Sequence, residues 1–156
     1  MAERAVIDTG PLIALQRADA LDVIGTLPIE FMSPAQVQQE LNEGVQRGHA
    51  AVTAPWLRVE KVSTPLDAVA LADLGAGEAA VIHLALERRI DLVVIDERKG
   101  RRAALAVGLR VTGALGLLGR AKVLGRIPAV RPFVERLRAD WYDAGLLERF
   151  LGALGE

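Results

Sequence analysis

Four acidic side chains in this chain could carry out metal-dependent chemistry if the fold brings them together: Asp8, Glu40, Glu78 and Asp96. Carboxylates crowded into one cleft raise one another's pKa and destabilise the fold unless a counter-charge is present. A divalent cation is the natural counter-charge, and a site built only from carboxylate oxygens suits Mg²⁺ or Mn²⁺ better than Zn²⁺. The sequence has no Cys and only two His, so thiolate metal sites, disulfides and Cys nucleophiles are excluded.

Two of these acids mark the ends of apolar segments. Residues 5–8 and 92–95 have the pattern of short buried strands; Asp8 ends the first and Asp96 follows the second. In an α/β sheet, the carboxyl ends of parallel strands border the crevice in which ligands bind. We therefore expect Asp8 and Asp96 at the same edge of one sheet.

Helix periodicity places the other two acids. On the helix expected at 78–89, Glu78 lies within about 60° of the apolar residues, at 100° per residue. On the helix expected from Pro34 to Gln46, Glu40 flanks the core-facing side, about 100° from its mean direction. Each acid alone has an ordinary alternative role, as a helix cap, a complement to a helix dipole or a surface charge. Their joint placement is what favours a site.

The elements that must position these acids alternate between strand and helix. This order predicts parallel pairing with right-handed crossovers, and hence an α/β fold, a three-layer α/β/α sandwich around a short central parallel sheet. Further strands are expected at 29–32 and 109–112, with an irregular extended segment at 51–62, and Ser33 is expected to be the N-cap of the helix that follows it. Further helices are expected at 11–18, 20–25, 65–74, 98–107, 114–125, 129–139 and 142–154.

The composition suits one domain over residues 1–156, including a helical C-terminal region at about 129–154. No apolar run is long enough to span a membrane, and no leader pattern opens the chain. We therefore expect a cytoplasmic protein without a membrane partner.

Charge is segregated along the chain although the net charge is only −1. Residues 97–138 carry 2 acids and 11 bases, whereas residues 1–96 carry 14 acids and 7 bases. Within the basic segment, one side of the helix after Asp96 carries four cations, which could bind the phosphates of a nucleic acid. The alternatives are a solvated Arg-rich surface or, for the last two of the four, an ion pair with the acids. The four cations are Arg98, Lys99, Arg101 and Arg102.

Three segments of the chain resemble the PIN-domain nucleases. They are residues 6–13 (VIDTGPLI), residues 75–82 (GAGEAAVI), and residues 93–97 (VVIDE) followed by GRRAA. The likeness is strongest to the prokaryotic subgroup whose central helix starts with Gly-x-Gly-Glu. Segments 112–118, 121–122 and 125–127 and the closing Gly155-Glu156 extend it over nearly the whole chain.

The resemblance implies a PIN-like fold and a metal-dependent endoribonuclease, often the VapC-type toxin of a type II toxin–antitoxin pair. Asp8, Glu40, Glu78 and Asp96 match the family's acidic quartet, which serves as catalytic residues and metal ligands, with Glu78 where an Asp is usual. Thr9 matches the small hydroxyl residue that supports the quartet. One or two Mg²⁺ or Mn²⁺ ions would activate a water and orient the scissile phosphate. The partners implied are RNA, held by the four cations above, a cognate antitoxin, and a second copy in a homodimer.

Several alternatives are open at this point. Either Asp96 or the adjacent Glu97 could be the fourth acid, and Asp96 is favoured because it ends the strand. A catalytically inactive PIN fold, acting as an RNA-binding or protein-interaction scaffold, is the main alternative to a nuclease. The triplet at 8–10 also occurs in aspartic proteases, but those are all-β and need two such loops. A phosphoacceptor domain would need a Lys at a later strand end, which this chain lacks.

Overall fold

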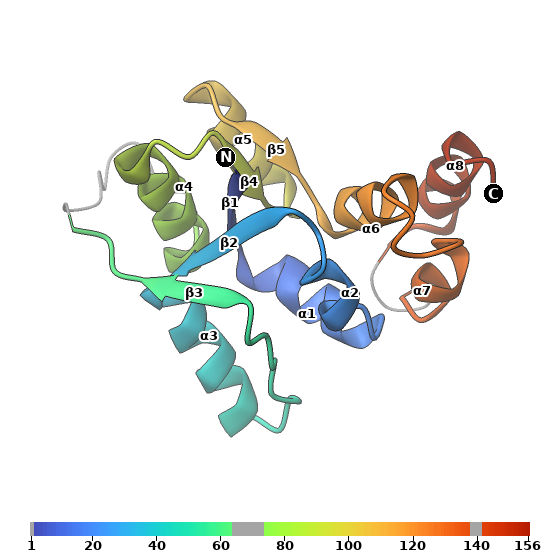
Figure 1. The fold of residues 1–156 in the computed structure, drawn as a ribbon. Coiled ribbons are helices and arrows are strands. Elements are labelled where there is room, and N and C mark those ends of the chain that lie inside the picture. Colours follow the sequence, from blue (N-terminus) through green and yellow to red (C-terminus); the bar gives the residue numbers. More distant parts are fainter. Residues whose placement is uncertain (1, 64–73, 138–141) are drawn as a thin grey trace.

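The computed structural model describes residues 2–63, 74–137 and 142–156. At its centre is a five-stranded parallel sheet with strand order β3-β2-β1-β4-β5 (Figure 1). The strands are β1 (Glu3–Ile7), β2 (Ile29–Pro34), β3 (Leu57–Glu60), β4 (Leu92–Val94) and β5 (Arg110–Thr112). The helices are α1 (Thr9–Arg17), α2 (Leu21–Ile24), α3 (Ala35–Gln46), α4 (Ala76–Arg88), α5 (Arg98–Ala106), α6 (Ala114–Val123), α7 (Arg131–Glu135) and α8 (Ala144–Ala153).

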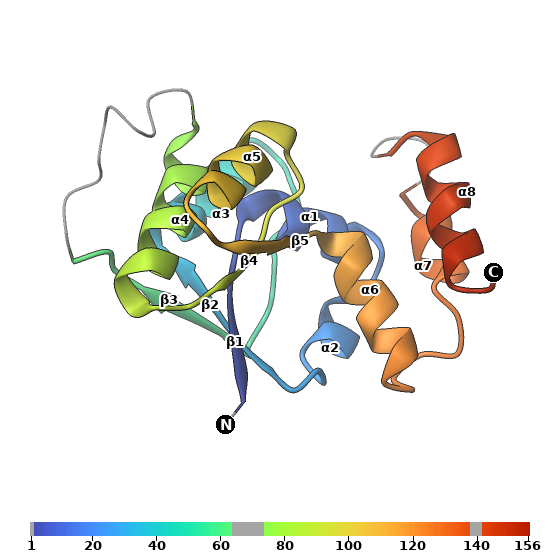
Figure 2. The same ribbon diagram turned by 90° about the horizontal axis from the view of Figure 1, so that it is seen from above.

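The helices form layers on both faces of this sheet, which confirms the predicted three-layer α/β/α architecture. Helices α4 and α5 cover one face, and α1, α2, α3 and α6 cover the other (Figures 1 and 2). Helices α7 and α8 lie beyond α6, at the end that holds the C-terminus (Figure 2). No helix among the described residues is long and apolar enough to cross a membrane.

The neighbours β1 and β4 form the topological switch point of the sheet. From β1 the chain moves outward to β2 and β3, and from β4 it moves outward in the opposite direction to β5. Residues 5–7 of β1 and all of β4 are apolar and buried, with Val6 opposite Val93 and Ile7 opposite Val94. Ligands of open α/β sheets bind outside the carboxyl ends of the strands at such a point. Asp8 and Asp96 follow these two strands.

The structure corrects two local predictions. Ser33 is not a helix N-cap, because β2 continues through Ser33 and Pro34, which pair with Val59 and Glu60 of β3; Pro34 is the N-cap of α3. Of the helix expected at 129–139, residues 138–139 lie outside the described part of the chain, and within 129–137 the helix is limited to the short α7, after which Leu137 N–H bonds the carbonyl three residues back. Nearly all of the helix expected at 65–74 lies outside the described residues.

Hydrogen bonds of Glu156 hold the C-terminal segment against α6 and the start of α7. Its carboxylate accepts hydrogen bonds from the backbone N–H groups of Val130 and Arg131, at 2.8 and 2.9 Å, and from Lys122 Nζ at 2.9 Å. Burial alone would raise the pKa of Glu156, but these hydrogen bonds lower it. Gly155 has a φ of +79°, which favours glycine.

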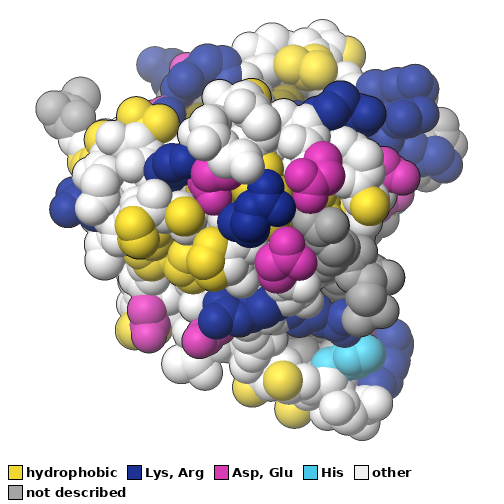
Figure 3. Space-filling view, turned by 90° about the vertical axis from the view of Figure 1, so that its right-hand side faces the viewer, with side chains coloured by type: hydrophobic (Ala, Val, Ile, Leu, Met, Phe, Trp, Pro, Cys, Tyr) yellow, Lys and Arg dark blue, Asp and Glu magenta, His cyan; other side chains and the backbone are white. Residues whose placement is uncertain are grey.

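The surface over α6, α7 and α8 carries interspersed acidic and basic side chains (Figure 3). Arg131 forms ion pairs there with Glu135 and Glu148.

Candidate active site

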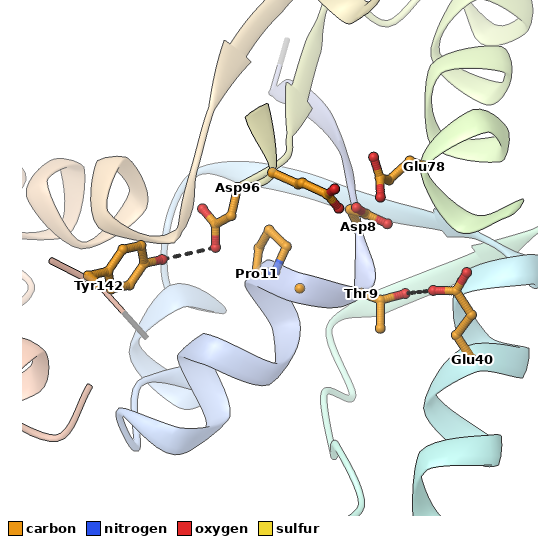
Figure 4. Close-up of a pocket in the computed structure, with 9 residues that line it drawn as sticks. Asp8, Thr9, Pro11, Glu40, Glu78, Asp96 and Tyr142 are labelled. Atoms are coloured by element: carbon orange, nitrogen blue, oxygen red, sulfur yellow. Dashed lines mark hydrogen bonds between the residues drawn. The ribbon is translucent and has the colours of Figure 1, made fainter. Parts of the chain in front are cut away.

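An acidic cleft of about 430 Å³ lies at the carboxyl edge of the sheet, at the switch point between β1 and β4. The structure brings all four predicted acids into it, together with Glu97. Figure 4 shows Asp8 and Glu78 lying between Asp96 on one side and Glu40 on the other. The cleft is lined by Asp8, Thr9, Gly10, Pro11, Glu40, Glu78, Asp96, Glu97 and Tyr142.

Asp8 is the most deeply placed of these acids. Its backbone N–H extends the β1–β4 ladder by donating to Val94 O at 3.0 Å, which fixes the residue at the end of the strand. Its side chain is 6 % exposed, and Oδ1 is buried with no hydrogen-bond partner among the described residues. Burial raises the pKa of Asp8 to about 7, and the nearby charge of Glu40 contributes, against a lowering effect of the Thr9 backbone N–H.

Glu78 enters the cleft from the first turn of α4. Its pKa is raised to about 8, first by burial, then by a hydrogen bond with Glu97 and by the charge of Asp8. Glu97 is the N-cap residue of α5, so its backbone lies at the same sheet edge as Asp96. Both members of the Asp96–Glu97 pair therefore reach the cleft, and Glu97 is the one that contacts Glu78.

Glu40 is held in place by two hydrogen bonds from different elements. Thr9 Oγ1 donates to Oε2 at 2.6 Å (Figure 4), and the backbone N–H of Gly77 donates to Oε1 at 2.8 Å. Thr9 follows Asp8 directly, and Gly77 directly precedes Glu78. The Glu40 carboxylate is thus hydrogen-bonded to the residues adjacent in sequence to Asp8 and Glu78.

Asp96 is held in the same manner on the opposite side of the cleft. The backbone N–H of Ala114, at the start of α6, donates to Oδ1 at 2.9 Å, and Tyr142 Oη donates to Oδ2 at 3.0 Å (Figure 4). Burial raises the pKa of Asp96 in spite of these bonds and of the nearby Arg101 charge. Sequence reasoning missed Tyr142, because no motif or periodicity links a residue so near the C-terminus to a strand end 46 positions earlier.

Three glycines leave room for three of the carboxylates. A Cβ built on Gly77 would lie 2.5 Å from Glu40 Oε1, and one built on Gly100 would lie 2.7 Å from Glu78 Oε2. A Cβ on Gly113 would overlap Asp96 Oδ1. Any larger residue at these positions would push the adjacent carboxylate aside. These glycines belong to the segments that carry the family resemblance, and the structure gives them a physical role that the sequence alone did not reveal.

A family model described as DUF3368, a PIN domain, matches residues 4–156 of this sequence. The chain belongs to the PIN-domain family. PIN domains are generally nucleases that use divalent metals. No curated protein and no solved structure matches the chain.

The acids of this PIN domain fit a hard divalent cation by their chemistry. Every charged side chain that lines the cleft is a carboxylate, and the buried Asp8 Oδ1 has no hydrogen-bond partner in the part of the chain that the structure describes. A bound cation would supply that partner. No group of three or more His, Asp or Glu side chains among the described residues is drawn together closely enough to form a complete ligand set. Both oxygens of Glu40 and both oxygens of Asp96 accept hydrogen bonds from neighbouring protein groups.

The basic helix α5 of the PIN domain divides into two parts. Arg98, Lys99 and Arg102 are exposed, as a phosphate-binding face requires. Arg101 instead is half-buried and donates from Nη1 to Ile95 O at 2.8 Å, and its charge partly opposes the rise that burial causes in the pKa of Asp96. Of the two arginines proposed as partners for the acids, Arg101 is therefore the one that faces them.

Proposed function

We propose that this PIN domain is a metal-dependent endoribonuclease that hydrolyses RNA phosphodiester bonds. The observation that carries the proposal is the environment of Asp8, which has a buried oxygen without a hydrogen-bond partner among the described residues and lines one cleft with four further carboxylates. Such a cluster is costly without a cation, and perturbed carboxylates in a cleft are typical of catalytic sites. The choice of RNA as substrate rests on the family resemblance.

In this proposal, Asp8, Glu40, Glu78 and Asp96 are the residues that would hold Mg²⁺ or Mn²⁺. When bound, the cation would supply Lewis-acid activation of a water and would offset the charge on the leaving oxygen. Glu97, which forms a hydrogen bond with Glu78, is the alternative to Asp96 as the fourth metal ligand.

The remaining residues of the cleft position the acids. Thr9 lies at the start of α1, and its hydroxyl donates to Glu40. Its hydroxyl and the Gly77 N–H keep Glu40 oriented, and Ala114 and Tyr142 do the same for Asp96. Mutation of a residue that orients a metal ligand typically costs 10- to 100-fold in metal affinity or activity. The exposed cations Arg98, Lys99 and Arg102 would bind flanking phosphates.

The test is cleavage of single-stranded RNA with Mg²⁺ or Mn²⁺ by the parent, Asp8→Ala and Glu78→Ala proteins, with EDTA as the metal-free control. The proposal predicts cleavage by the parent alone and none in EDTA. Equal RNA loss from the parent and both variants would remove the nuclease function, and intact RNA that binds equally to all three would favour the inactive RNA-binding scaffold.

We also propose, on the family resemblance, that the protein is the toxin of a toxin–antitoxin pair acting in the cytoplasm. Expression should then arrest growth, and co-expression of the neighbouring gene product should relieve the arrest. Arrest that persists in both Asp8→Ala and Glu78→Ala would contradict the toxin role.

A homodimer is the remaining part of the proposal. Exposed apolar side chains support it, including Val123 and Leu124 at the end of α6, which are 77 % and 45 % exposed. Sedimentation equilibrium should give twice the mass of the chain, and a single-chain mass across the micromolar range would contradict a dimer.

A further inference from the structure

A second cleft, of about 470 Å³, adjoins the acidic cleft at Asp96. Asp96 and Tyr142 line both clefts, so the hydrogen bond between them forms the wall that separates the two. Figure 4 shows Tyr142 reaching Asp96 from the side opposite to Asp8 and Glu78. The other side chains of the second cleft that matter here are Arg101, Thr112, Leu115, Leu146 and Phe150.

The lining of the second cleft has the chemistry that recognises a nucleobase. Tyr142 and Phe150 provide aromatic rings, Leu115 and Leu146 provide apolar surface, and Thr112 provides a hydroxyl. Unstacked RNA bases bind on aromatic rings and on guanidinium planes, and they hydrogen-bond through their edges. Leu146 is 43 % exposed, so apolar surface is open to a ligand at the rim.

Arg101 can contact a planar base because its guanidinium is already held in place by a hydrogen bond. Its hydrogen bond to Ile95 O fixes the guanidinium in the lining of the second cleft, where its charge also acts on Asp96. A fixed guanidinium gives up little side-chain entropy when it binds a planar ligand. This placement sets Arg101 apart from the exposed cations of α5, which suit phosphates.

Building on the proposed nuclease function, we propose that the second cleft receives the nucleobase adjacent to the scissile phosphate. The RNA backbone passes over the Asp96–Tyr142 wall, which places the phosphate above the acidic cleft and the next base against Tyr142, Phe150 and Arg101. The C-terminal helix α8 is then part of the substrate site.

The first test measures RNA binding in an Asp8→Asn background, which is cleavage-deficient in the proposed function, by fluorescence anisotropy with a labelled single-stranded oligoribonucleotide. Leu146→Glu places a negative charge at the rim, and Val45→Glu is the matched control, since Val45 of α3 is similarly exposed and lines neither cleft. A Glu at position 146 is compatible with α8, because it completes a capping box with Asp143, which already accepts from the Leu146 N–H.

Leu146→Glu should weaken binding about fivefold or more, the loss expected when one stacked base is released, and Val45→Glu should change it less than about twofold. Equal affinity in the two variants, or no measurable RNA binding by the Asp8→Asn protein, would overturn the proposal.

The second test separates base contact from the positioning of Asp96. Tyr142→Phe keeps the ring but loses the hydrogen bond, so RNA affinity should be retained while the cleavage rate of the otherwise unaltered protein falls. Tyr142→Leu should lose affinity as well. Tyr142→Leu and Tyr142→Phe proteins that bind RNA equally would contradict a stacked base.

The two proposals fail in distinguishable ways. If the parent cleaves RNA and Leu146→Glu leaves both affinity and KM unchanged, the nucleobase site is wrong and the nuclease stands. If the parent cuts no RNA but Leu146→Glu and Tyr142→Leu still weaken binding, the nuclease is wrong and the base site stands.

Discussion

Thr9 and Glu40, 31 positions apart in sequence, are joined by a hydrogen bond of 2.6 Å from Thr9 Oγ1 to Glu40 Oε2. The bond connects the start of α1, next to Asp8, with the middle of α3. Because Gly77 N–H binds the other oxygen of Glu40, the carboxylate is fixed from α1 and from α4 at once. The orientation of this carboxylate in the acidic cleft therefore depends on residues that are not themselves acids.

Replacing Thr9 with Val should lower the cleavage rate about 10- to 100-fold, because the hydroxyl that orients Glu40 is lost while the side-chain volume is kept. Thr9→Ser keeps the hydroxyl and should retain most of the activity. Single-turnover cleavage at saturating Mn²⁺ is the measurement, and a Thr9→Val protein as active as Thr9→Ser would refute the positioning role.

Replacing Gly77 with Ala should cost activity without a comparable cost in stability. The new methyl would collide with the Glu40 carboxylate, which is the mobile end of a flexible side chain and can swing away. Gly152→Ala is the control, since a Cβ there meets nothing within 4 Å, and it should stabilise α8 by about 0.5–1 kcal/mol. Thermal unfolding and cleavage should be measured for both variants. Full activity in Gly77→Ala would show that the Glu40 position is unimportant.

Stability should depend on pH in a direction opposite to that of ordinary paired carboxylates. The folded-state pKa values of Asp8 and Glu78, about 7 and about 8, lie above the ordinary values of 3.8 and 4.5. Between these limits the native state holds protons that the unfolded chain releases, so in EDTA the free energy of unfolding should fall as pH rises. A divalent cation should reverse this loss near neutral pH.

The same reasoning predicts that Asp8→Asn stabilises the metal-free protein at pH 8. Relief of the buried charge should be worth about 1–3 kcal/mol, or roughly 3–10 °C in Tm. The control is Asp91→Asn, because a hydrogen bond from Arg110 lowers the pKa of this exposed acid, so its loss should not stabilise. An Asp8→Asn protein less stable than the parent in EDTA at pH 8 would contradict the crowding of charge at this site.

RNA binding should be salt-dependent through the exposed cations of α5. Lys99→Ala and Arg102→Ala should each reduce the slope of log K against log salt concentration by about 1. Arg126→Ala, an exposed cation beyond the far end of α6, should leave the slope unchanged. Equal slopes for all three variants would place the RNA phosphates elsewhere.

Much of the acidic cleft could be predicted from sequence because its acids occupy positions with simple geometric rules. Asp8 and Asp96 end buried strands, and strand ends of a parallel sheet meet at one edge. Glu78 follows from helix phase. These rules act over a few neighbouring residues, so they need no knowledge of distant packing.

The features that could not be predicted depend on contacts between distant segments. Tyr142 reaches Asp96 only because α8 packs beyond α6, and Gly77 is needed only because α3 brings Glu40 against α4. Ser33 has the local signature of a helix cap, but pairing with β3 carries the strand past it. Glu97 and Asp96 are adjacent in sequence, so only the direction of each side chain shows that both reach the cleft.

The most direct measurement is the nature of the ends produced when the purified protein cuts a 5′-labelled RNA in Mn²⁺. Attack by water needs no 2′-hydroxyl. We therefore predict that the products carry no 2′,3′-cyclic phosphate and that cleavage persists when the 2′-oxygens of the RNA are methylated. The Asp8→Asn and Glu78→Gln proteins should cut neither the unmodified nor the methylated RNA. Cyclic phosphate ends that form equally in EDTA, or in both variants, would contradict metal-dependent hydrolysis at this acidic cleft.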